Sequence, residues 1–209
     1  MNGLRPGGLE LSRQLLANVH LHPGDAVLDL GCGRGESLAL LREDYACCPF
    51  GLEPDAEHRA VAQARNPGIP ILDGRAESLP FPDQSFHLVL AECVLSLCEP
   101  LEAALSEIRR VLKPGGTLLL SDVYARKEAL SGGTAMLRRL YSLPQLEQAL
   151  RQAGFSIRRE EEAKAVLLQM LGQLILEKGP EEAYACLGVD ACRLKQASPG
   201  YILITAEVP

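Results

Sequence analysis

The chain has 209 residues, of which 47% are hydrophobic and 23% are charged. A chain of this length and composition buries a sizeable core on its own, which excludes disordered, collagen-like and disulfide-stapled classes of protein. The formal net charge is −6, aromatic residues make up only 4% and tryptophan is absent. We therefore expect no nucleic-acid partner, because such a partner requires a basic surface and often stacking rings.

The N-terminal segment lacks the apolar run of a secretory signal peptide, and no window is apolar enough to cross a membrane. We therefore expect a cytoplasmic protein with no membrane partner. Its seven cysteines are expected to be reduced in that compartment, and most of them to be small buried hydrophobic residues. No Cys-x-x-Cys pair occurs, so the spacing indicates no structural metal site.

Apolar runs alternate with amphipathic segments along the first part of the chain. A polar arm is expected at 1–8, followed by a helix at 9–19 in which leucine recurs at helical spacing. The expected strands are 26–30, 46–52, 70–72, 86–91 and 117–121, and the expected helices between them are 36–43, 55–65 and 100–112. This alternation predicts an α/β fold with a mostly parallel sheet and helices on both faces. Such a sheet binds ligands beyond the carboxyl ends of its strands.

The C-terminal part of the sequence is less regular. The expected elements are helices at 134–141 and 144–153, a strand at 155–159, helical stretches at 161–178 and 180–195, and a last strand at 201–206. The segment 161–195 is thus a predicted helical insertion before the last strand. Its apolar stripe, which includes Leu171, indicates a lid, a homodimer surface or plain core packing. We expect 1–209 to form a single domain, with 26–122 as the cofactor-binding core.

The strongest local motif is a glycine-rich turn between the first predicted strand and the helix that follows it. It reads VLDLGCGRG over residues 27–35. Glycine permits positive φ angles and lets a ligand approach the backbone closely, and the helix start offers free N–H groups. About one βα unit further on, Glu53 ends the second predicted strand, where its carboxylate is placed to bind ribose hydroxyls. The alternative for Glu53 is an N-cap of the next helix.

The spacing of these glycines favours one class of cofactor over another. A dinucleotide fingerprint reads G-x-G-x-x-G, whereas Gly31, Gly33 and Gly35 form G-x-G-x-G and are followed by Glu36. An acid at a helix start repels a pyrophosphate group, so NAD and nucleotide sugars are disfavoured. A cofactor with an amino-acid tail and no phosphate fits this turn better.

The motifs together resemble those of the class I S-adenosylmethionine-dependent methyltransferases, and among them the small-molecule "type 11" members. The resemblance rests on VLDLGCGRG at 27–35, GLEP at 51–54, RAESLPF at 75–81, DQSFHLVLAE at 83–92 and RVLKPGGTLLLSD at 110–122. It implies S-adenosylmethionine as cofactor and a Rossmann-like, seven-stranded sheet. The last strand of that sheet is expected to be antiparallel and to lie between the fifth and sixth strands.

The resemblance also implies cofactor contacts. Asp29, Gly31, Cys32 and Gly33 are expected around the methionine part, Glu53 at the ribose hydroxyls, Pro54 against the adenine, and Ala76 and Glu77 at the adenine edge. Family members often carry an aspartate just before the Ala-Glu pair, where it accepts from the adenine amino group. This chain has Arg75 there, which offers no acceptor, so Asp73 or a backbone carbonyl remains for that contact.

The methyl acceptor is predicted less sharply than the cofactor. Methyl transfer from a sulfonium is an in-line displacement, and a base is required only when the nucleophile must lose a proton. Glu92, at the end of the fourth predicted strand, either orients the cofactor's amino-acid part or acts as that base. Asp122 and Tyr124, after the fifth strand, are further hypotheses. His87 lies at the opposite end of its strand and is expected to be structural.

Three function classes remain open from the sequence. The first is methyl transfer to a small-molecule acceptor. The second is a cofactor-binding regulatory or partner protein without turnover, since a fold does not fix a function. The third is arsenite methylation, in which thiolates from Cys93, Cys98, Cys186 and Cys192 hold the soft ion.

Overall fold

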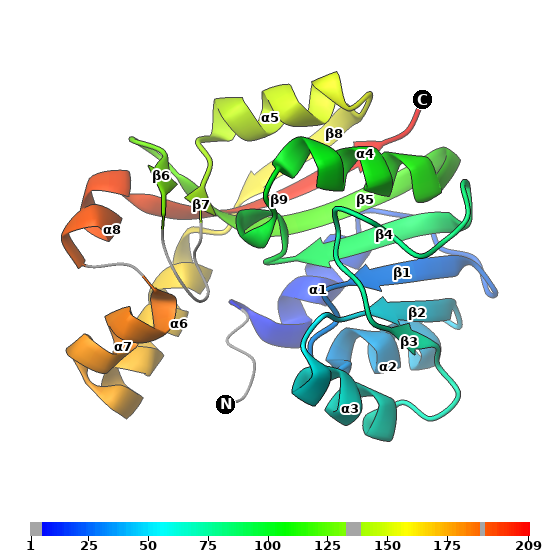
Figure 1. The fold of residues 1–209 in the computed structure, drawn as a ribbon, viewed down its shortest axis with the longest axis horizontal. Coiled ribbons are helices and arrows are strands. Elements are labelled where there is room, and N and C mark those ends of the chain that lie inside the picture. The colour runs from blue at the N-terminus through cyan, green and yellow to red at the C-terminus, as the bar shows by residue number, and fades with distance from the viewer. Residues whose placement is uncertain (1–5, 133–138, 189–190) are drawn as a thin grey trace.

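The computed structural model describes residues 6–132, 139–188 and 191–209. A seven-stranded sheet with the order β3-β2-β1-β4-β5-β9-β8 forms its centre (Figure 1). Its strands are β1 (Ala26–Leu30), β2 (Cys48–Leu52), β3 (Ile71–Leu72), β4 (Phe86–Glu92), β5 (Leu112–Ala125), β8 (Ser156–Glu162) and β9 (Pro199–Glu207). The neighbours from β3 to β5 are parallel, whereas β9 is antiparallel to both β5 and β8. The predicted fold class is therefore confirmed.

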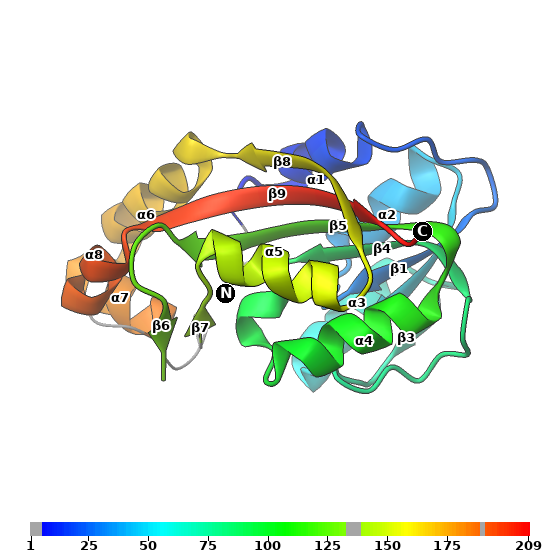
Figure 2. The same cartoon turned by 90° about the horizontal axis from the view of Figure 1, so that it is seen from above.

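Helices cover both faces of this sheet (Figure 2). On one face lie α1 (Gly8–Leu16) and α2 (Glu36–Glu43), and on the other lie α4 (Leu101–Val111) and α5 (Leu143–Gln152). The strands are apolar on both sides because side chains alternate along them, so that Val27 joins the α1 side and Leu28 the α4 side. Helix α3 (Ala56–Arg65) packs near the β3 edge through Ala62.

The predicted helical insertion consists of three helices at the end of the sheet where β1 and β4 terminate (Figure 1). They are α6 (Lys164–Lys178), α7 (Pro180–Leu187) and α8 (Ala191–Ala197). The insertion starts later than 161 because Glu161 and Glu162 pair with β9 and extend β8. The expected stretch 180–195 is two helices rather than one, since α7 ends at Leu187 and Gly188 follows with a φ of 76°.

Two further elements differ from the sequence predictions. The strand expected at 117–121 extends over the whole of β5, because pairing with β9 continues as far as Ala125. Most of the helix expected at 134–141 lies outside the described residues, but Arg139–Leu140 forms β7 and pairs with β6 (Leu130–Ser131), so a helix is wrong there. Cross-strand pairing overrides the local helical pattern at this site.

At the N-terminus, the first five residues of the expected arm lie outside the described part of the chain. Pro6 is buried, and α1 begins at Gly8 and ends at Leu16 rather than at residue 19. None of the helices within the described ranges is both long and apolar enough to span a membrane.

Candidate functional site

A pocket of about 410 Å³ opens at the carboxyl ends of β1, β2 and β4. This volume is in the range of small-molecule sites in proteins. All nine site residues expected from the sequence line it, namely Asp29, Gly31, Cys32, Gly33, Glu53, Pro54, Ala76, Glu77 and Glu92. Every lining residue of this pocket falls between positions 29 and 98. The loops after three neighbouring parallel strands therefore converge on one site, as such sheets do.

The glycine-rich turn uses its three glycines for different purposes. Gly33 has a φ of 54°, and a Cβ placed on it meets nothing within 4 Å, so its bare backbone faces the pocket. Gly35 has a φ of 79°, and a Cβ there meets Asn66 Nδ2 at 2.4 Å and Ala62 at 3.1 Å. Gly33 thus leaves space for a ligand, whereas Gly35 lets α2 pack closely against α3.

Glu53 is held firmly at this turn. Its Oε2 accepts a hydrogen bond from the Gly33 N–H at 2.8 Å, and its Oε1 accepts one from the Asp55 N–H at 2.9 Å. The N-cap of α3 is Asp55, whose carboxylate accepts from the His58 N–H at 2.8 Å. A carboxylate has about four acceptor positions, so two of those on Glu53 remain for a ligand. The alternative role of Glu53 as the helix cap is filled by its neighbour.

The pocket is strongly acidic in its interior. The side chains of Asp29, Glu53 and Glu92 are 3%, 7% and 7% exposed. Burying three carboxylates in one cavity favours a cationic ligand and opposes a pyrophosphate.

Arg34, which sequence reasoning did not single out, also lines the pocket, and its buried Nε has no hydrogen-bond partner among the described residues. That orphaned donor suits the carboxylate of an amino-acid tail.

Glu92 is fixed by two serine hydroxyls from different helices. Ser12 Oγ in α1 lies 3.1 Å and 2.9 Å from the two carboxylate oxygens, and Ser37 Oγ in α2 donates to Oε2 at 3.3 Å. Ser12 and Ser37 are fully or nearly fully buried. Sequence reasoning missed both serines, and the one signal for Ser12 is a polar residue between Leu11 and Leu15 on the apolar face of α1.

At the side of the pocket where the adenine is expected, Arg75 supplies a cation rather than a hydrogen-bond acceptor. Arg75 lines the pocket with Ala76 and Glu77, and Arg75 Nε lies 3.7 Å from Glu77 Oε2. Asp73 is not among the lining residues, and its Oδ1 lies 3.3 Å from Arg59 on the surface. The structure thus places Asp73 at the surface beside Arg59 rather than in the lining of the pocket.

The cysteines are distributed over the structure rather than gathered. Cys98 lines the pocket, and burial raises the pKa of its thiol to about 12, so it stays protonated near neutral pH. Burial also raises the pKa of the Cys32 thiol. Within the described ranges, no three His, Cys, Asp or Glu side chains come together in a way that holds a metal ion. The thiolate ligands that the arsenite hypothesis requires find no support in this arrangement.

Tyr124 and Asp122, the two residues predicted near the acceptor, have different surroundings in the structure. The Tyr124 hydroxyl donates to Glu162 Oε1 at 2.7 Å, and Tyr124 lines neither of the pockets described in this article. Asp122 is buried and lines a second, smaller cavity. Cys93 lines both cavities, so they are direct neighbours. His87 has the structural role expected for it, since its Nδ1 accepts from the Ala26 N–H at 3.0 Å.

Comparisons with known proteins identify the family of the chain. A family model described as a methyltransferase domain matches residues 28–120, a range that contains every lining residue of the larger pocket. An uncharacterized methyltransferase of Bacillus subtilis, YodH, is 37% identical over 128 residues, 60% of this chain and 54% of its own length. A malonyl-[acyl-carrier protein] O-methyltransferase of Erwinia pyrifoliae is 35% identical over 166 residues, 71% of this chain and 62% of its own length.

Among solved structures, the [4+2]-cyclase SpnF is 30% identical with a TM-score of 0.79, over 95% of this chain and 80% of the cyclase chain. The fold and the site define a nucleoside-binding α/β protein of the Rossmann-like type. The chain belongs to the class I S-adenosylmethionine-dependent methyltransferases. It spans about half the length of the curated relatives it matches first.

Proposed function

We propose that this protein transfers a methyl group from S-adenosylmethionine to a small-molecule acceptor. The observation that carries the proposal is the position of Glu53. Its carboxylate is buried beside the bare backbone of Gly33, fixed by two backbone N–H groups and not used as the cap of α3. A fixed acceptor with free lone pairs at this point suits the two ribose hydroxyls of a nucleoside.

In this proposal the nine residues expected from the sequence and Arg34 each have a role. Asp29, Gly31, Cys32 and Gly33 surround the methionine part, Glu53 binds the ribose, Pro54 packs against the adenine, Ala76 and Glu77 lie at the adenine edge, and Glu92 orients the amino-acid part. Arg34 adds a donor for the tail carboxylate. The buried acids stabilise the positive charges of the cofactor's sulfonium and ammonium groups. Together these residues hold the methyl carbon in line with the acceptor.

Calorimetry and a transfer assay test the proposal separately. We expect the protein to bind S-adenosylmethionine and its demethylated product, and not NAD. Incubation of the labelled cofactor with a fractionated metabolite extract should move the label into a small molecule. Binding of NAD in place of the other two ligands would overturn the cofactor assignment.

The transfer readout matters because fold and cofactor do not fix the reaction. The structural neighbour SpnF is titled a [4+2]-cyclase, although it shares 30% of its aligned residues with this chain. Tight cofactor binding without label transfer to any acceptor in the extract would favour the regulatory alternative. Nothing in the sequences compared gives specific support to that alternative, so methyl transfer stands as the first proposal.

The setting of the reaction completes the proposal. We infer a single methyltransferase domain in the cytoplasm that acts on a small molecule, without a nucleic acid or membrane partner.

The apolar stripe of the insertion packs inward, since Leu174 is buried and Leu171 packs against the core. A homodimer would instead use Leu168 and Leu176, which are 71% and 88% exposed on α6. Light scattering tests the homodimer. If it forms through these residues, the wild type should have twice the mass of one chain and Leu176→Glu the mass of a single chain.

A further inference from the structure

A second cavity of about 40 Å³ lies beside the cofactor pocket, between the sheet and the insertion. Its walls are mostly apolar side chains from α6, α7 and α8, among them Met170, Leu187 and Leu194. Its polar lining residues are Cys93 directly after β4, Ser96 in the short 3-10 helix Leu95–Leu97, and Asp122 in the last part of β5. The polar groups are therefore at the sheet and the apolar groups at the insertion.

Asp122 is the charged group of this cavity. It is 2% exposed, its Oδ2 accepts from the Ser96 N–H at 2.9 Å, and its Oδ1 accepts from the Val123 N–H at 2.7 Å. Burial raises the pKa of this carboxyl to about 6, although the backbone hydrogen bonds oppose the shift. A buried carboxylate that titrates just below neutral pH is suited to accept a proton from a ligand.

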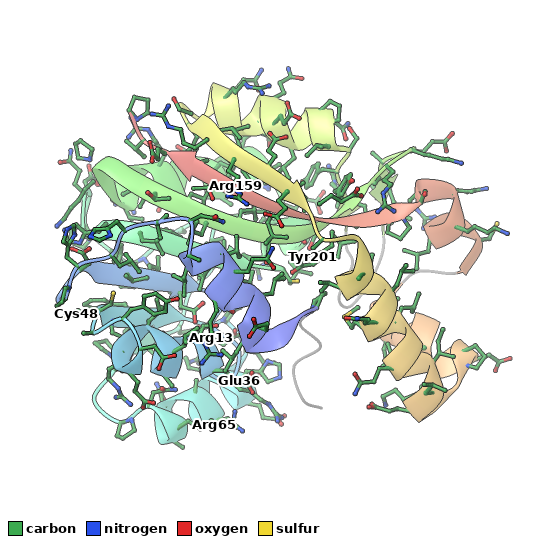
Figure 3. All side chains as sticks on the ribbon, turned by 180° about the vertical axis from the view of Figure 1, so that it is seen from behind. Arg13, Glu36, Cys48, Arg65, Arg159 and Tyr201 are labelled. Atoms are coloured by element: carbon green, nitrogen blue, oxygen red, sulfur yellow. The ribbon has the colours of Figure 1, made fainter. Side chains whose placement is uncertain are left out.

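Cys93 lines both cavities and marks the point where they adjoin. Its φ is 57°, a left-handed conformation that is uncommon outside glycine and is often found at functional sites. Its backbone N–H donates to the Ser121 carbonyl at 2.7 Å, and its Sγ lies 3.1 Å from the Tyr201 hydroxyl. Tyr201 lies on β9 and is labelled in Figure 3. Its carbonyl accepts from the N–H of Ala163, just before α6, at 2.9 Å. Cys93 is thus held through Ser121 on β5 and Tyr201 on β9.

We propose that the second cavity receives the hydroxyl end of an uncharged, apolar acceptor, a phenol or an enol, and that Asp122 accepts the hydroxyl proton. This inference rests on the proposed function, because the larger pocket must supply the methyl donor. The cavity holds little more than a few water molecules, so only the hydroxyl end enters it. The apolar body of the acceptor packs against the insertion helices, which must move to admit it.

The step balances in atoms and charge. The acceptor O–H bond breaks and its proton passes to the Asp122 carboxylate. The acceptor oxygen forms a bond to the methyl carbon as the carbon–sulfur bond breaks, and that bonding pair remains on the sulfur. A cationic sulfonium, a neutral alcohol and a carboxylate thus become a neutral thioether, a neutral methyl ether and a carboxylic acid. Asp122 then releases the proton to solvent.

The charges around the second cavity disfavour two other classes of acceptor, carboxylates and ammonium ions. A free carboxylate acceptor would lie next to the Asp122 carboxylate in an apolar cavity, which opposes its binding. An ammonium acceptor would lie beside the sulfonium, and the two positive charges would repel each other. A neutral hydroxyl meets neither obstacle, and its partial negative charge in the transition state is attracted by the sulfonium.

Two probes with the same ring and different charges test the inference: naphthol and naphthoate, substituted at the same ring position. Their dissociation constants are measured at neutral pH with the protein saturated by S-adenosylhomocysteine. We expect naphthol to bind at least about tenfold more tightly than naphthoate to the wild type. In Asp122→Asn, naphthol affinity should fall about tenfold and the preference over naphthoate should disappear. The exposed Asp83→Asn, in the loop before β4, should leave both constants unchanged.

A transfer readout accompanies the binding readout. Label should pass from S-adenosylmethionine to naphthol in the wild type and be lost in Asp122→Asn, while calorimetry gives the same cofactor affinity in both proteins. Equal binding of naphthol and naphthoate by the wild type, no binding of any probe, or undiminished transfer in Asp122→Asn would overturn the inference. Because cofactor affinity is measured independently, failure of the proposed function appears as a wild type that binds neither S-adenosylmethionine nor its product.

Discussion

The hydroxyl of Ser12 contacts both carboxylate oxygens of Glu92, at 3.1 Å and 2.9 Å, although the two residues are 80 positions apart. Helix α1 is thereby joined to the end of β4 at the floor of the cofactor pocket. The contact is buried, so it is stronger than a hydrogen bond at the surface. The N-terminal helix therefore belongs to the cofactor site.

Ser12→Ala should weaken cofactor binding and lower the free energy of unfolding by about 1.5–3 kcal/mol, as is typical when a hydrogen bond to a charged group is lost. Calorimetry and urea unfolding measure the two quantities. Ser85→Ala is the matched control, because Ser85 makes an exposed hydrogen bond to Pro82 away from the pocket. Equal cofactor affinity in Ser12→Ala and wild type would show that Ser12 has no influence on the site through Glu92.

Glu53→Ala should reduce cofactor affinity by about 1.5–3 kcal/mol. Removing one ribose hydroxyl from the ligand should cost the wild type a similar amount and the variant little, because the partner is already gone. Calorimetry on the four combinations gives the coupling energy. Fully additive losses would mean that Glu53 does not contact the ribose.

The glycines of the turn should separate folding from binding. Gly35→Ala should destabilise the protein strongly, since its methyl group meets Asn66 Nδ2 at 2.4 Å. Gly33→Ala should cost only about 1–2 kcal/mol of stability, from its left-handed backbone, but should weaken cofactor binding as well. Gly24→Ala controls for the strain, because Gly24 has a φ of 87°, open space around it and no place in the pocket. If Gly33→Ala and Gly24→Ala bind the cofactor equally well, the approach of the ligand to Gly33 is disproved.

Asp122 should make folding stability depend on pH. Its pKa is raised in the folded protein from 3.8 to about 6, so ionising it costs about 3 kcal/mol there. Well below pH 3.8, at about pH 3, the group is protonated in both states and almost no cost arises, whereas at about pH 7 nearly the full cost applies. The free energy of unfolding of Asp122→Asn relative to wild type should therefore rise by about 3 kcal/mol between about pH 3 and pH 7.

The neighbouring titratable groups Cys98 and Tyr201 do not blur this window, since burial raises the pKa of both and they remain neutral throughout it. Urea unfolding of both proteins at several pH values checks the prediction. A constant difference between them across this range would contradict a raised pKa for Asp122.

The sequence brings the expected site residues to one pocket because their determinants are local. The glycine turn and Glu53 each follow a short apolar run, and the glycine spacing together with Glu36 disfavours a pyrophosphate. The second cavity depends on contacts that local patterns do not contain. Cys93 and Tyr201 are 108 positions apart, and nothing near either residue indicates that they touch.

The same reason explains the errors in the predicted elements. Glu161 and Glu162 carry a helical pattern when read with the residues that follow them, but β9 recruits them into β8. Arg139 and Leu140 are helix formers that β6 pairs into a strand. Strand partners, distant in the chain for Glu161 and Glu162 and about ten positions away for Arg139 and Leu140, decide the conformation at these positions rather than intrinsic preference.

The place of β9 inside the sheet has a consequence for the order in which the protein becomes functional during synthesis. Every lining residue of the larger pocket precedes position 99, whereas the second cavity includes Pro199. Strand β9 is made after all the others, yet in the sheet it lies between β5 and β8 and brings Tyr201 next to Cys93. A growing chain on the ribosome can therefore assemble the strands around the larger pocket first. The second cavity is completed only when β9 has emerged, so we expect a nascent chain to form the pocket proposed for the donor before the cavity proposed for the acceptor.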